Sequence, residues 1–575
     1  MRLTLPIYAI FCFLCFTACK NSKTEEETSD NSAYTNAYSY NTVKNITTKK
    51  AAVVTAHPLA SEIGKSILEQ GGNAIDASIA VQYALAVVYP VAGNIGGGGF
   101  MVVHTANGES HSIDFRETAP AAAHKDMYLD ENGDAIAAKS LDGHLAPGVP
   151  GTVAGIYLAH KKFGKLSMDK LIEPAIKLAE HGFVITQQEA DGLNKHADAF
   201  VNLNTVPNAF SKNTAWKSGD TLVQKDLSNT LKRIKKQGQA GFYEGETARL
   251  IIEEMQRGGG IITLEDLKNY KPVIREPRVF SYKDKKIVSM DLPSSGGLML
   301  QQMLKMLEPY DLKGMGFQSA EAIHHIVEVE RRAYADRTEY MGDPDFVDVP
   351  VEALLNTEYI TNRMKDFEPG KAGNSKDIHP GLEESEETTH FSIIDEEGNA
   401  VAVTTTINTD YGSRVVVGGA GFLLNNEMDD FSAKPGAPNA FGLLGTDANA
   451  IEPNKRMVSS MMPTIVLDNN RPYMVVGTPG GSTIITSVLQ SILNIMEFEL
   501  TPEEAVNTPK FHHQWKPDVI YIEEDFPSNI AYQLEEMGYT IEKRSPIGRT
   551  ELILIDEKGI HAIADKRGDD SASGY

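Results

Sequence analysis

Two threonine-rich stretches carry the side chains best suited to nucleophilic chemistry in this sequence. Residues 388–395 read Thr-Thr-His-Phe-Ser-Ile-Ile-Asp, and residues 399–408 read Asn-Ala-Val-Ala-Val-Thr-Thr-Thr-Ile-Asn. A three-residue link that ends in Gly398 joins them, which predicts a β-hairpin with this glycine in the left-handed conformation. In this register Thr388 lies directly opposite Thr406 on the neighbouring strand.

A hairpin of this composition also has a purely structural interpretation, because threonine has a high strand propensity. Side chains alternate along a strand with a period of two, so Asn408 lies on the same side of its strand as Thr406. The hairpin alone favours the structural interpretation. Motifs elsewhere in the chain must decide between the two.

Other residue types that often carry chemistry do not form recognised sites here. The run Gly96–Gly99 fits neither the dinucleotide fingerprint nor the P-loop, so it predicts close backbone packing near a site instead of nucleotide binding. The pairs His324-His325 and His512-His513 lack the spacing of metal ligands and are predicted to be structural. We expect no metal and no organic cofactor.

The composition excludes several classes of protein. Cys12, Cys15 and Cys19 all lie in the first twenty residues, which excludes a disulfide framework, a thiolate metal site and a cysteine nucleophile from the body. The 575 residues are 41% hydrophobic and 23% charged, as in ordinary globular proteins with a large core. The net charge of −24 argues against nucleic acid as a partner, since phosphate binding requires a basic face.

The N-terminus has the pattern of a bacterial lipoprotein signal. A short basic start and an apolar run from Ile7 to Phe16 precede Thr17-Ala18-Cys19, which resembles a lipobox. We expect residues 1–18 to be a signal peptide, Cys19 to be lipidated and residues 19–48 to be a flexible tether. The alternative is an ordinary secretory signal. The predicted location is the bacterial cell envelope, in the periplasm or at the outer membrane, with a lipid anchor.

The body alternates predicted strands and helices. Hydrophobic spacing and end signals predict strands over 51–56 and 100–103 and helices over 58–69, 73–88, 171–181 and 322–337. The helix over 73–88 is apolar on most sides and is expected to be buried, with Asn73 as its N-cap. The charged residues of the last helix predict a solvated or salt-bridged face; they are Glu328, Glu330, Arg331, Arg332, Asp336 and Arg337. The acidic run 383–387 predicts an exposed or mobile segment directly before Thr388.

Five motifs in order resemble those of one family. They are Asp114-Phe115-Arg116-Glu117-Thr118-Ala119-Pro120, Thr388-Thr389-His390-Phe391-Ser392, Asn425-Asn426-Glu427-Met428-Asp429-Asp430-Phe431, Ser459-Ser460-Met461 and Pro479-Gly480-Gly481-Ser482. From about residue 51 to the end, the chain resembles the γ-glutamyltranspeptidases (glutathione hydrolases) of the N-terminal nucleophile hydrolase superfamily.

This resemblance implies an α/β fold of the α+β kind, a four-layer αββα sandwich. It implies a precursor that cuts itself between Glu387 and Thr388 into a large subunit, residues 49–387, and a small catalytic subunit, residues 388–575. The two subunits are expected to stay together as a heterodimer. Thr388 is then the nucleophile, and its freed α-amine, which titrates near pH ~8, suits the role of general base.

The motifs also imply roles for individual residues. Catalysis falls to Thr388, Thr406, Gly480 and Gly481, and substrate binding to Arg116, Thr406, Asn408, Glu427, Asp430, Ser459, Ser460 and Gly481. Backbone N–H groups of the two glycines suit an oxyanion hole. The fork of Arg116 and the two serine hydroxyls suit a carboxylate, and the acidic residues with Asn408 suit an ammonium group.

The implied activity is γ-glutamyl transfer from glutathione and related compounds to water, amino acids or peptides. Lys434 to Ala450 resembles the lid loop of some members, with Phe441 where many bacterial members have tyrosine. Such a lid favours small γ-glutamyl substrates. The alternatives are a related acylase, a poly-γ-glutamate depolymerase, and an uncleaved, inactive lipoprotein that binds peptides.

Overall fold

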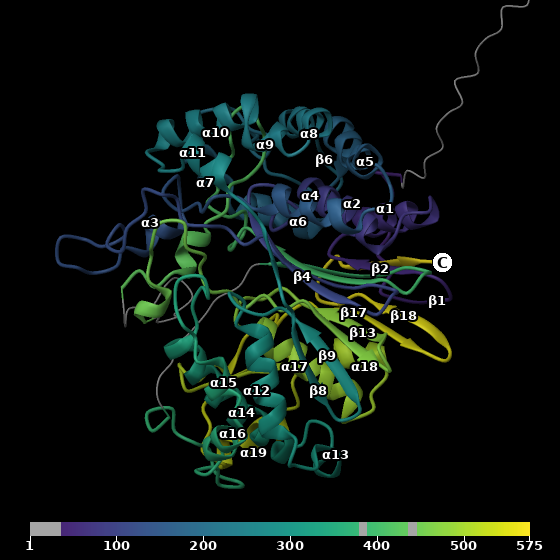
Figure 1. Cartoon of the computed structure of the whole chain (residues 1–575), viewed down its shortest axis with the longest axis vertical. Helices are drawn as coiled ribbons and strands as arrows, with labels where there is room; N and C mark the ends of the chain where they lie inside the picture. Colours follow the sequence, from purple (N-terminus) through teal and green to yellow (C-terminus); the bar gives the residue numbers. More distant parts are fainter. Residues whose placement is uncertain (1–35, 379–387, 435–445) are drawn as a thin grey trace, which may run out of the picture.

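The computed structural model describes residues 36–378, 388–434 and 446–575 (Figure 1). The predicted signal peptide, Cys19, Glu387 and Phe441 lie outside these residues. Within them, no helix combines the length and apolar character needed to cross a membrane.

Two seven-stranded antiparallel sheets form the centre of the protein. Sheet I runs in the order β19 (Ser571–Gly574), β2 (Ala52–Thr55), β10 (Thr389–Ile394), β11 (Ala400–Thr406), β3 (Gly98–His104), β4 (Ser110–Asp114) and β7 (Val273–Arg275). Sheet II runs in the order β1 (Asn45–Thr48), β18 (Gly559–Ile563), β17 (Glu551–Asp556), β13 (Arg471–Gly477), β12 (Thr464–Asp468), β9 (Lys285–Ser289) and β8 (Arg278–Tyr282). Both sheets therefore mix strands from before and after Thr388.

Helices cover the outer face of each sheet (Figure 1). Sheet I carries α1 (Pro58–Glu69), α2 (Ala74–Val88) and α4 (Thr152–Phe163), with α5 (Met168–His181) and α8 (Lys225–Gln237) outside them. Sheet II carries α12 (Gly296–Leu307), α17 (Thr483–Met496) and α18 (Pro502–Asn507), with α14 (Ala320–Tyr340) packed on α12. The predicted four-layer αββα sandwich is confirmed.

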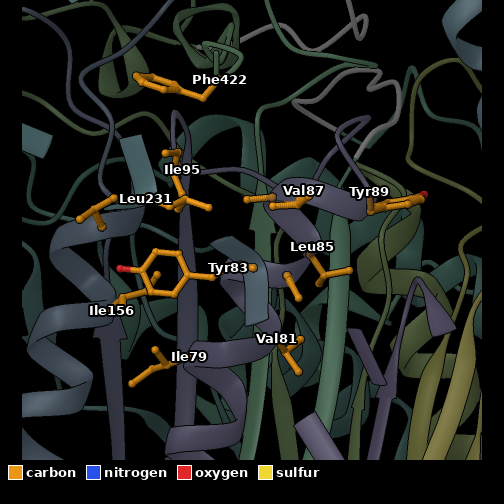
Figure 2. Close-up of a cluster of buried hydrophobic side chains, with 14 of the residues drawn as sticks. Ile79, Val81, Tyr83, Leu85, Val87, Tyr89, Ile95, Ile156, Leu231 and Phe422 are labelled. Carbon is orange, nitrogen blue, oxygen red and sulfur yellow. The ribbon is translucent and has the colours of Figure 1, made fainter. Parts of the chain in front are cut away.

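Alternation along the strands builds the two cores. In β2, Val53 packs among the helices of sheet I, whereas Ala52 and Val54 face sheet II. Helix α2 is buried along its whole length because α5 and its neighbours cover the side that faces away from the sheet. Figure 2 shows its side chains Ile79, Val81, Tyr83, Leu85 and Val87 within one apolar cluster that includes Ile156 and Leu231. The Asn73 side chain caps this helix, as predicted.

The shorter elements lie around this sandwich. They are α3 (Ala137–Leu141), β5 (Phe183–Val184), α6 (Gln187–Lys195), α7 (Ala197–Asn202), β6 (Thr221–Leu222), α9 (Ala240–Tyr243), α10 (Gly245–Gly258), α11 (Leu264–Asn269), α13 (Leu312–Met315), α15 (Val351–Leu354), α16 (Thr357–Arg363), η1 (Glu427–Asp430), η2 (Asp447–Asn449), β14 (Phe511–His512), β15 (Ile520–Ile522), α19 (Ser528–Glu536) and β16 (Ile541–Lys543).

The predicted threonine hairpin is present with its predicted register. Thr389 pairs with Thr405, and the pairing continues to Ile394 and Ala400 at the turn. Gly398 has a φ of +92°, the left-handed conformation expected of it. The hairpin lies in the middle of sheet I, flanked by β2 and β3.

The glycine run packs tightly against this hairpin. A Cβ atom on Gly97 would lie 2.1 Å from the Thr406 carbonyl oxygen, and one on Gly99 would lie 2.4 Å from that of Thr404. The residues at these positions must therefore lack a side chain for β3 to approach β11. Close packing was the predicted role of the run.

The charged face of α14 is buried, so the prediction of a solvated face is wrong and that of a salt-bridged face is confirmed. Arg331 and Arg332 are at most 1% exposed, and both pair with Glu328 on the same helix. Arg332 also pairs with Asp366. Helix α14 lies between α12 and α19, and charges in such a place require partners.

The folded body begins before residue 49, where the sequence placed the end of the tether. Strand β1 pairs with β18 from Asn45 to Thr48. Just before it, the Lys44 ammonium donates to the carbonyl oxygens of Asp565 (2.8 Å), Gly568 (2.6 Å) and Asp570 (2.7 Å). The end of the predicted tether therefore holds the loop that leads to the C-terminal strand.

We expect Lys44→Met to lower the thermal unfolding midpoint of the mature protein. The substitution keeps an unbranched chain of similar length but leaves three carbonyl groups without their charged donor, a change that typically costs about 1–3 kcal/mol. In a protein of this size the shift is roughly 1–3 °C. Lys65→Met on α1 is the control, because its nearest carboxylate oxygen is 3.7 Å away. Equal shifts for both variants in differential scanning fluorimetry would contradict the role of Lys44.

Candidate active site

Thr388 immediately precedes β10, at one end of sheet I. Its side chain is 6% exposed, and the hairpin register, continued by one residue, places it opposite Thr406. The hydroxyl oxygen of Thr406 accepts a hydrogen bond from the backbone nitrogen of Asn408 at 2.7 Å. The three residues predicted to lie together on the hairpin therefore lie at its open end.

Gly480 and Gly481 lie in the turn between β13 and α17, with φ angles of +130° and +55°. A Cβ atom on Gly480 would lie 2.3 Å from the Thr483 hydroxyl oxygen, which donates to the Gly480 carbonyl oxygen at 2.7 Å. This turn and Thr388 belong to the same end of the sandwich, because the His390 ring packs where a side chain on Gly477 would stand. Only glycine fits both the conformation and the space at Gly480.

Arg116 is the centre of a buried charge cluster. It follows β4, is 1% exposed, and donates to the carboxylates of Glu427 and Asp430, which both lie on the single turn η1. Burial raises the pKa of both acids, and the Arg116 guanidinium opposes this. The structure therefore brings together three of the predicted binding residues.

Backbone contacts connect this cluster to the other predicted residues. The Nε atom of Arg116 donates to the Met457 carbonyl oxygen at 3.4 Å, shortly before Ser459 and Ser460. The side-chain nitrogen of Asn408 donates at 3.0 Å to the carbonyl oxygen of Asn426, the residue before η1. The segments that carry the predicted carboxylate donors and ammonium acceptors are thus hydrogen-bonded to Arg116 or to the start of η1.

Two charged residues of the Arg116 motif, Asp114 and Glu117, were assigned no role from the sequence. Asp114 accepts from the Arg116 backbone nitrogen at 2.9 Å and from Arg275 at 2.7 Å, which fixes the end of β4. Glu117 is fully buried, 3.5 Å from an Arg116 nitrogen, and neither of its carboxylate oxygens has a hydrogen-bond partner in another described residue. Its signal in the sequence was an acidic residue directly beside the predicted guanidinium clamp.

The histidine pairs make hydrogen bonds to the surrounding framework, and His512 lies 3.3 Å from the hydroxyl of Ser482, the residue after Gly481. His324 contacts Tyr539 at 2.6 Å, and His512 contacts Gln514 at 2.6 Å. Burial lowers the pKa of His512 to about 3, so its ring is neutral. Across the described ranges, no group of three or more His, Cys, Asp or Glu side chains could hold a metal ion.

Fold and site define a hydrolase of the N-terminal nucleophile type, a four-layer αββα sandwich with a threonine at the head of a central strand. The profile of the family described as Gamma-glutamyltranspeptidase matches residues 60–575. A relative from Escherichia coli (strain K12), "Glutathione hydrolase proenzyme", is 46% identical over 539 residues and aligns over 92% of each chain. The chain therefore belongs to the γ-glutamyltranspeptidase family.

Solved structures support the same assignment. The γ-glutamyltranspeptidase of Helicobacter pylori is 48% identical with a TM-score of 0.55, over 56% of this chain and 94% of that one. A cephalosporin acylase from Bacillus halodurans is 26% identical with a TM-score of 0.81, over 94% of this chain and 99% of that one.

Glu117 gives the site a pH-dependent contribution to stability. Burial raises its pKa to about 8, and the Arg116 guanidinium only partly opposes this. An unfolded glutamate titrates near ~4.3, so the folded protein binds this proton more tightly than the unfolded chain does. The contribution of Glu117 to stability therefore falls as pH rises from about 4.3 to 8. The thermal unfolding midpoint of the neutral variant Glu117→Gln should therefore rise relative to that of the wild type as pH increases across that range. Melting curves at pH 5, 6.5 and 8 in which the difference stays constant would contradict this.

Proposed function

We propose that this protein is a γ-glutamyltransferase and glutathione hydrolase that matures by cleavage between Glu387 and Thr388. The observation that carries the proposal is the buried Arg116 cluster with Glu427 and Asp430. Arg116 lies at the same end of sheet I as Thr388, because the end of β4 pairs with the start of β3, which pairs with the end of β11 opposite the start of β10. Membership of the family and the close relative called a glutathione hydrolase proenzyme support it.

The charges of the cluster match the free amino-acid end of a γ-glutamyl group. In the structure Arg116 is neutralised by Glu427 and Asp430. A substrate with one carboxylate and one ammonium can replace these pairs: its carboxylate takes the fork of Arg116, and its ammonium takes the two acids. Ser459 and Ser460 each add a hydroxyl donor at the same end of the substrate, and Asn408 adds a side-chain carbonyl acceptor.

The reaction follows from a free threonine at the head of β10. The α-amine of Thr388 takes the hydroxyl proton, and the oxygen attacks the γ-carbonyl carbon of the substrate. Backbone N–H groups of Gly480 and Gly481 stabilise the oxyanion, and Thr406 orients the attacking hydroxyl. The C–N bond breaks, the leaving amine receives the proton, and a γ-glutamyl ester of Thr388 remains. Water or an acceptor amine then attacks this ester and releases glutamate or a new γ-glutamyl compound.

Maturation uses the same hydroxyl. Before cleavage the nitrogen of Thr388 is part of a peptide bond and cannot act as a base. The hydroxyl first attacks the Glu387 carbonyl carbon, the C–N bond is exchanged for an ester, and water opens this ester. The two resulting parts, the chain up to Glu387 and residues 388–575, remain associated because β10 and β11 pair with β2 and β3 on either side.

Replacing Thr388 tests whether the protein is this enzyme or an inactive lipoprotein that binds peptides. Thr388→Ala should remain a single chain and lose all turnover of a γ-glutamyl anilide, because both cleavage and catalysis need the hydroxyl. Thr388→Ser keeps a hydroxyl and should still be cut, more slowly. A denaturing gel and N-terminal sequencing of the smaller fragment measure both. Two fragments from Thr388→Ala would rule out the assigned nucleophile.

Recognition of the substrate ammonium group by Glu427 and Asp430 distinguishes the proposed activity from that of a related acylase. A glutaryl anilide lacks only the ammonium group of a γ-glutamyl anilide, so the wild type should strongly prefer the latter. Asp430→Asn removes an acceptor charge and should reduce kcat/KM for the γ-glutamyl anilide by roughly 10- to 100-fold, with much less effect on the glutaryl one. A wild type that prefers the glutaryl substrate would favour an acylase.

We also propose that the precursor is a lipoprotein of the bacterial cell envelope, anchored through Cys19. The support is the apolar run followed by Thr17-Ala18-Cys19. Cys19→Ser should abolish incorporation of labelled palmitate and move the mature enzyme from the membrane fraction to the soluble one. Cys15→Ser is the matched control, since it changes a cysteine inside the predicted signal peptide. Labelling that survives Cys19→Ser would refute the anchor.

A further inference from the structure

A turn from the large-subunit part of the chain supports the serine pair of the proposed site. Ser294 and Ser459 form an isolated β-bridge, and the backbone nitrogen of Ser459 donates to the Pro293 carbonyl oxygen at 3.0 Å. Ser295 donates to the Ser459 carbonyl oxygen twice, through its backbone nitrogen at 2.8 Å and through its hydroxyl at 2.9 Å. The backbone that presents Ser459 and Ser460 is thus fixed by residues 293–295.

Arg337 on α14 joins this turn to Ser460. Its Nε atom donates to the Ser295 hydroxyl oxygen at 2.9 Å, and its Nη2 atom donates to the Ser460 hydroxyl oxygen at 3.0 Å. The side chain is 5% exposed. In the sequence Arg337 is one member of the charged face of a helix, yet its guanidinium points to the proposed substrate site.

The charge of Arg337 also reaches the acids of the site. Burial raises the pKa of Asp430, and the guanidinium of Arg116, followed by that of Arg337, opposes this rise. Asp430 therefore lies within the field of both cations. Arg337 adds a second buried cation on the Ser460 side of a site in which Arg116 already contacts Glu427 and Asp430. This added positive charge favours a bound carboxylate there.

A hydroxyl whose oxygen accepts a hydrogen bond from a guanidinium becomes a stronger hydrogen-bond donor, and the direction of its proton is better defined. The donor occupies one lone pair of the Ser460 oxygen, so the hydroxyl proton is directed away from Arg337. Hydrogen bonds in a chain polarise one another, so a proton on this oxygen is donated more strongly than that of an isolated serine. The acceptor that profits most is an anionic carboxylate.

We propose that Arg337 is a positioning and specificity-determining residue for the α-carboxylate of the γ-glutamyl substrate, acting through the Ser460 hydroxyl. This inference rests on the proposed function. Arg116 binds the carboxylate directly, whereas Arg337 holds and polarises the hydroxyl that binds it from the other side. Ser295 fixes the guanidinium of Arg337 and the backbone of the serine pair at the same time.

The test compares two substrates that differ only in the α-carboxylate. A 4-aminobutanoyl anilide keeps the ammonium group and the scissile bond of the γ-glutamyl anilide but lacks that carboxylate. For Arg337→Gln we expect kcat/KM on the γ-glutamyl anilide to fall roughly 10- to 100-fold, mainly through KM, and to change less than about threefold on the 4-aminobutanoyl anilide. Arg337→Lys should recover part of the loss. Ser460→Ala combined with Arg337→Gln should lose little more than the worse single variant.

Arg363→Gln is the matched control, because Arg363 contacts Asp336 and the Arg332 carbonyl oxygen on α14 and touches neither Ser295 nor Ser460. It should leave the preference between the two substrates unchanged. If Arg337→Gln does not mature into two chains on a gel, Ser295→Ala replaces it, with the same substrate-selective rise in KM expected to a smaller extent.

The outcomes separate the inference from the function beneath it. Suppose that the wild type prefers the γ-glutamyl anilide. Equal losses of kcat/KM on both substrates for Arg337→Gln, or additive effects of the Arg337 and Ser460 variants, would then overturn the role of Arg337 alone. A wild type without that preference would overturn the proposed carboxylate recognition itself.

Discussion

The burial of the Arg116 guanidinium is the constraint on which the site depends. A cation that is 1% exposed must be neutralised, and the acids that do so, Glu427 and Asp430, come from a turn more than three hundred residues further along the chain. Their pairing joins the end of β4 to η1. Asp114 and Arg275 hold the backbone at that end, so the guanidinium has little freedom to leave the cluster.

The same constraint explains why the site suits a zwitterion. Each ion pair within the cluster can be exchanged for one with the substrate, so the buried charges remain balanced. A substrate that lacks either charge would leave a buried guanidinium or a buried carboxylate without its partner, which is costly in a low dielectric. The cluster of Arg116, Glu427 and Asp430 is therefore the basis of the proposed selectivity for the free amino-acid end of a γ-glutamyl group.

The two sheets explain how a chain cut before Thr388 can remain one body. Strands β10 and β11 lie in the centre of sheet I, between β2 and β3. In sheet II, the strands β18, β17, β13 and β12 from after Thr388 lie between β1 on one side and β9 and β8 on the other. Separating the parts would expose ladders of backbone groups and both apolar cores. The proposed new N-terminus is therefore at the start of a central strand, in a fold whose two sheets are already formed before cleavage.

The local elements could be predicted from the sequence because short-range physics sets them. The bounds of α1, the Asn73 cap, the hairpin register and the left-handed Gly398 each depend on residues close in the chain. Motif resemblance supplied Arg116, Glu427 and Asp430 and the four-layer fold. Arg331 of α14 pairs with Asp518, 187 residues further along the chain, and Lys44 donates to Asp570, 526 residues away, so periodicity could not reveal these partners.

The sequence by itself determined the hairpin at Thr388, and its motifs supplied the proposed nucleophile and the residue types of the proposed binding site for a carboxylate and an ammonium group. Only the tertiary structure decided how these charges neutralise one another, because pairing energy depends on distance and burial and not on order along the chain. Glu117 and Arg337 show the difference. Both are ordinary charged residues in the sequence, and burial beside Arg116 and Ser460 gives each a place in the site.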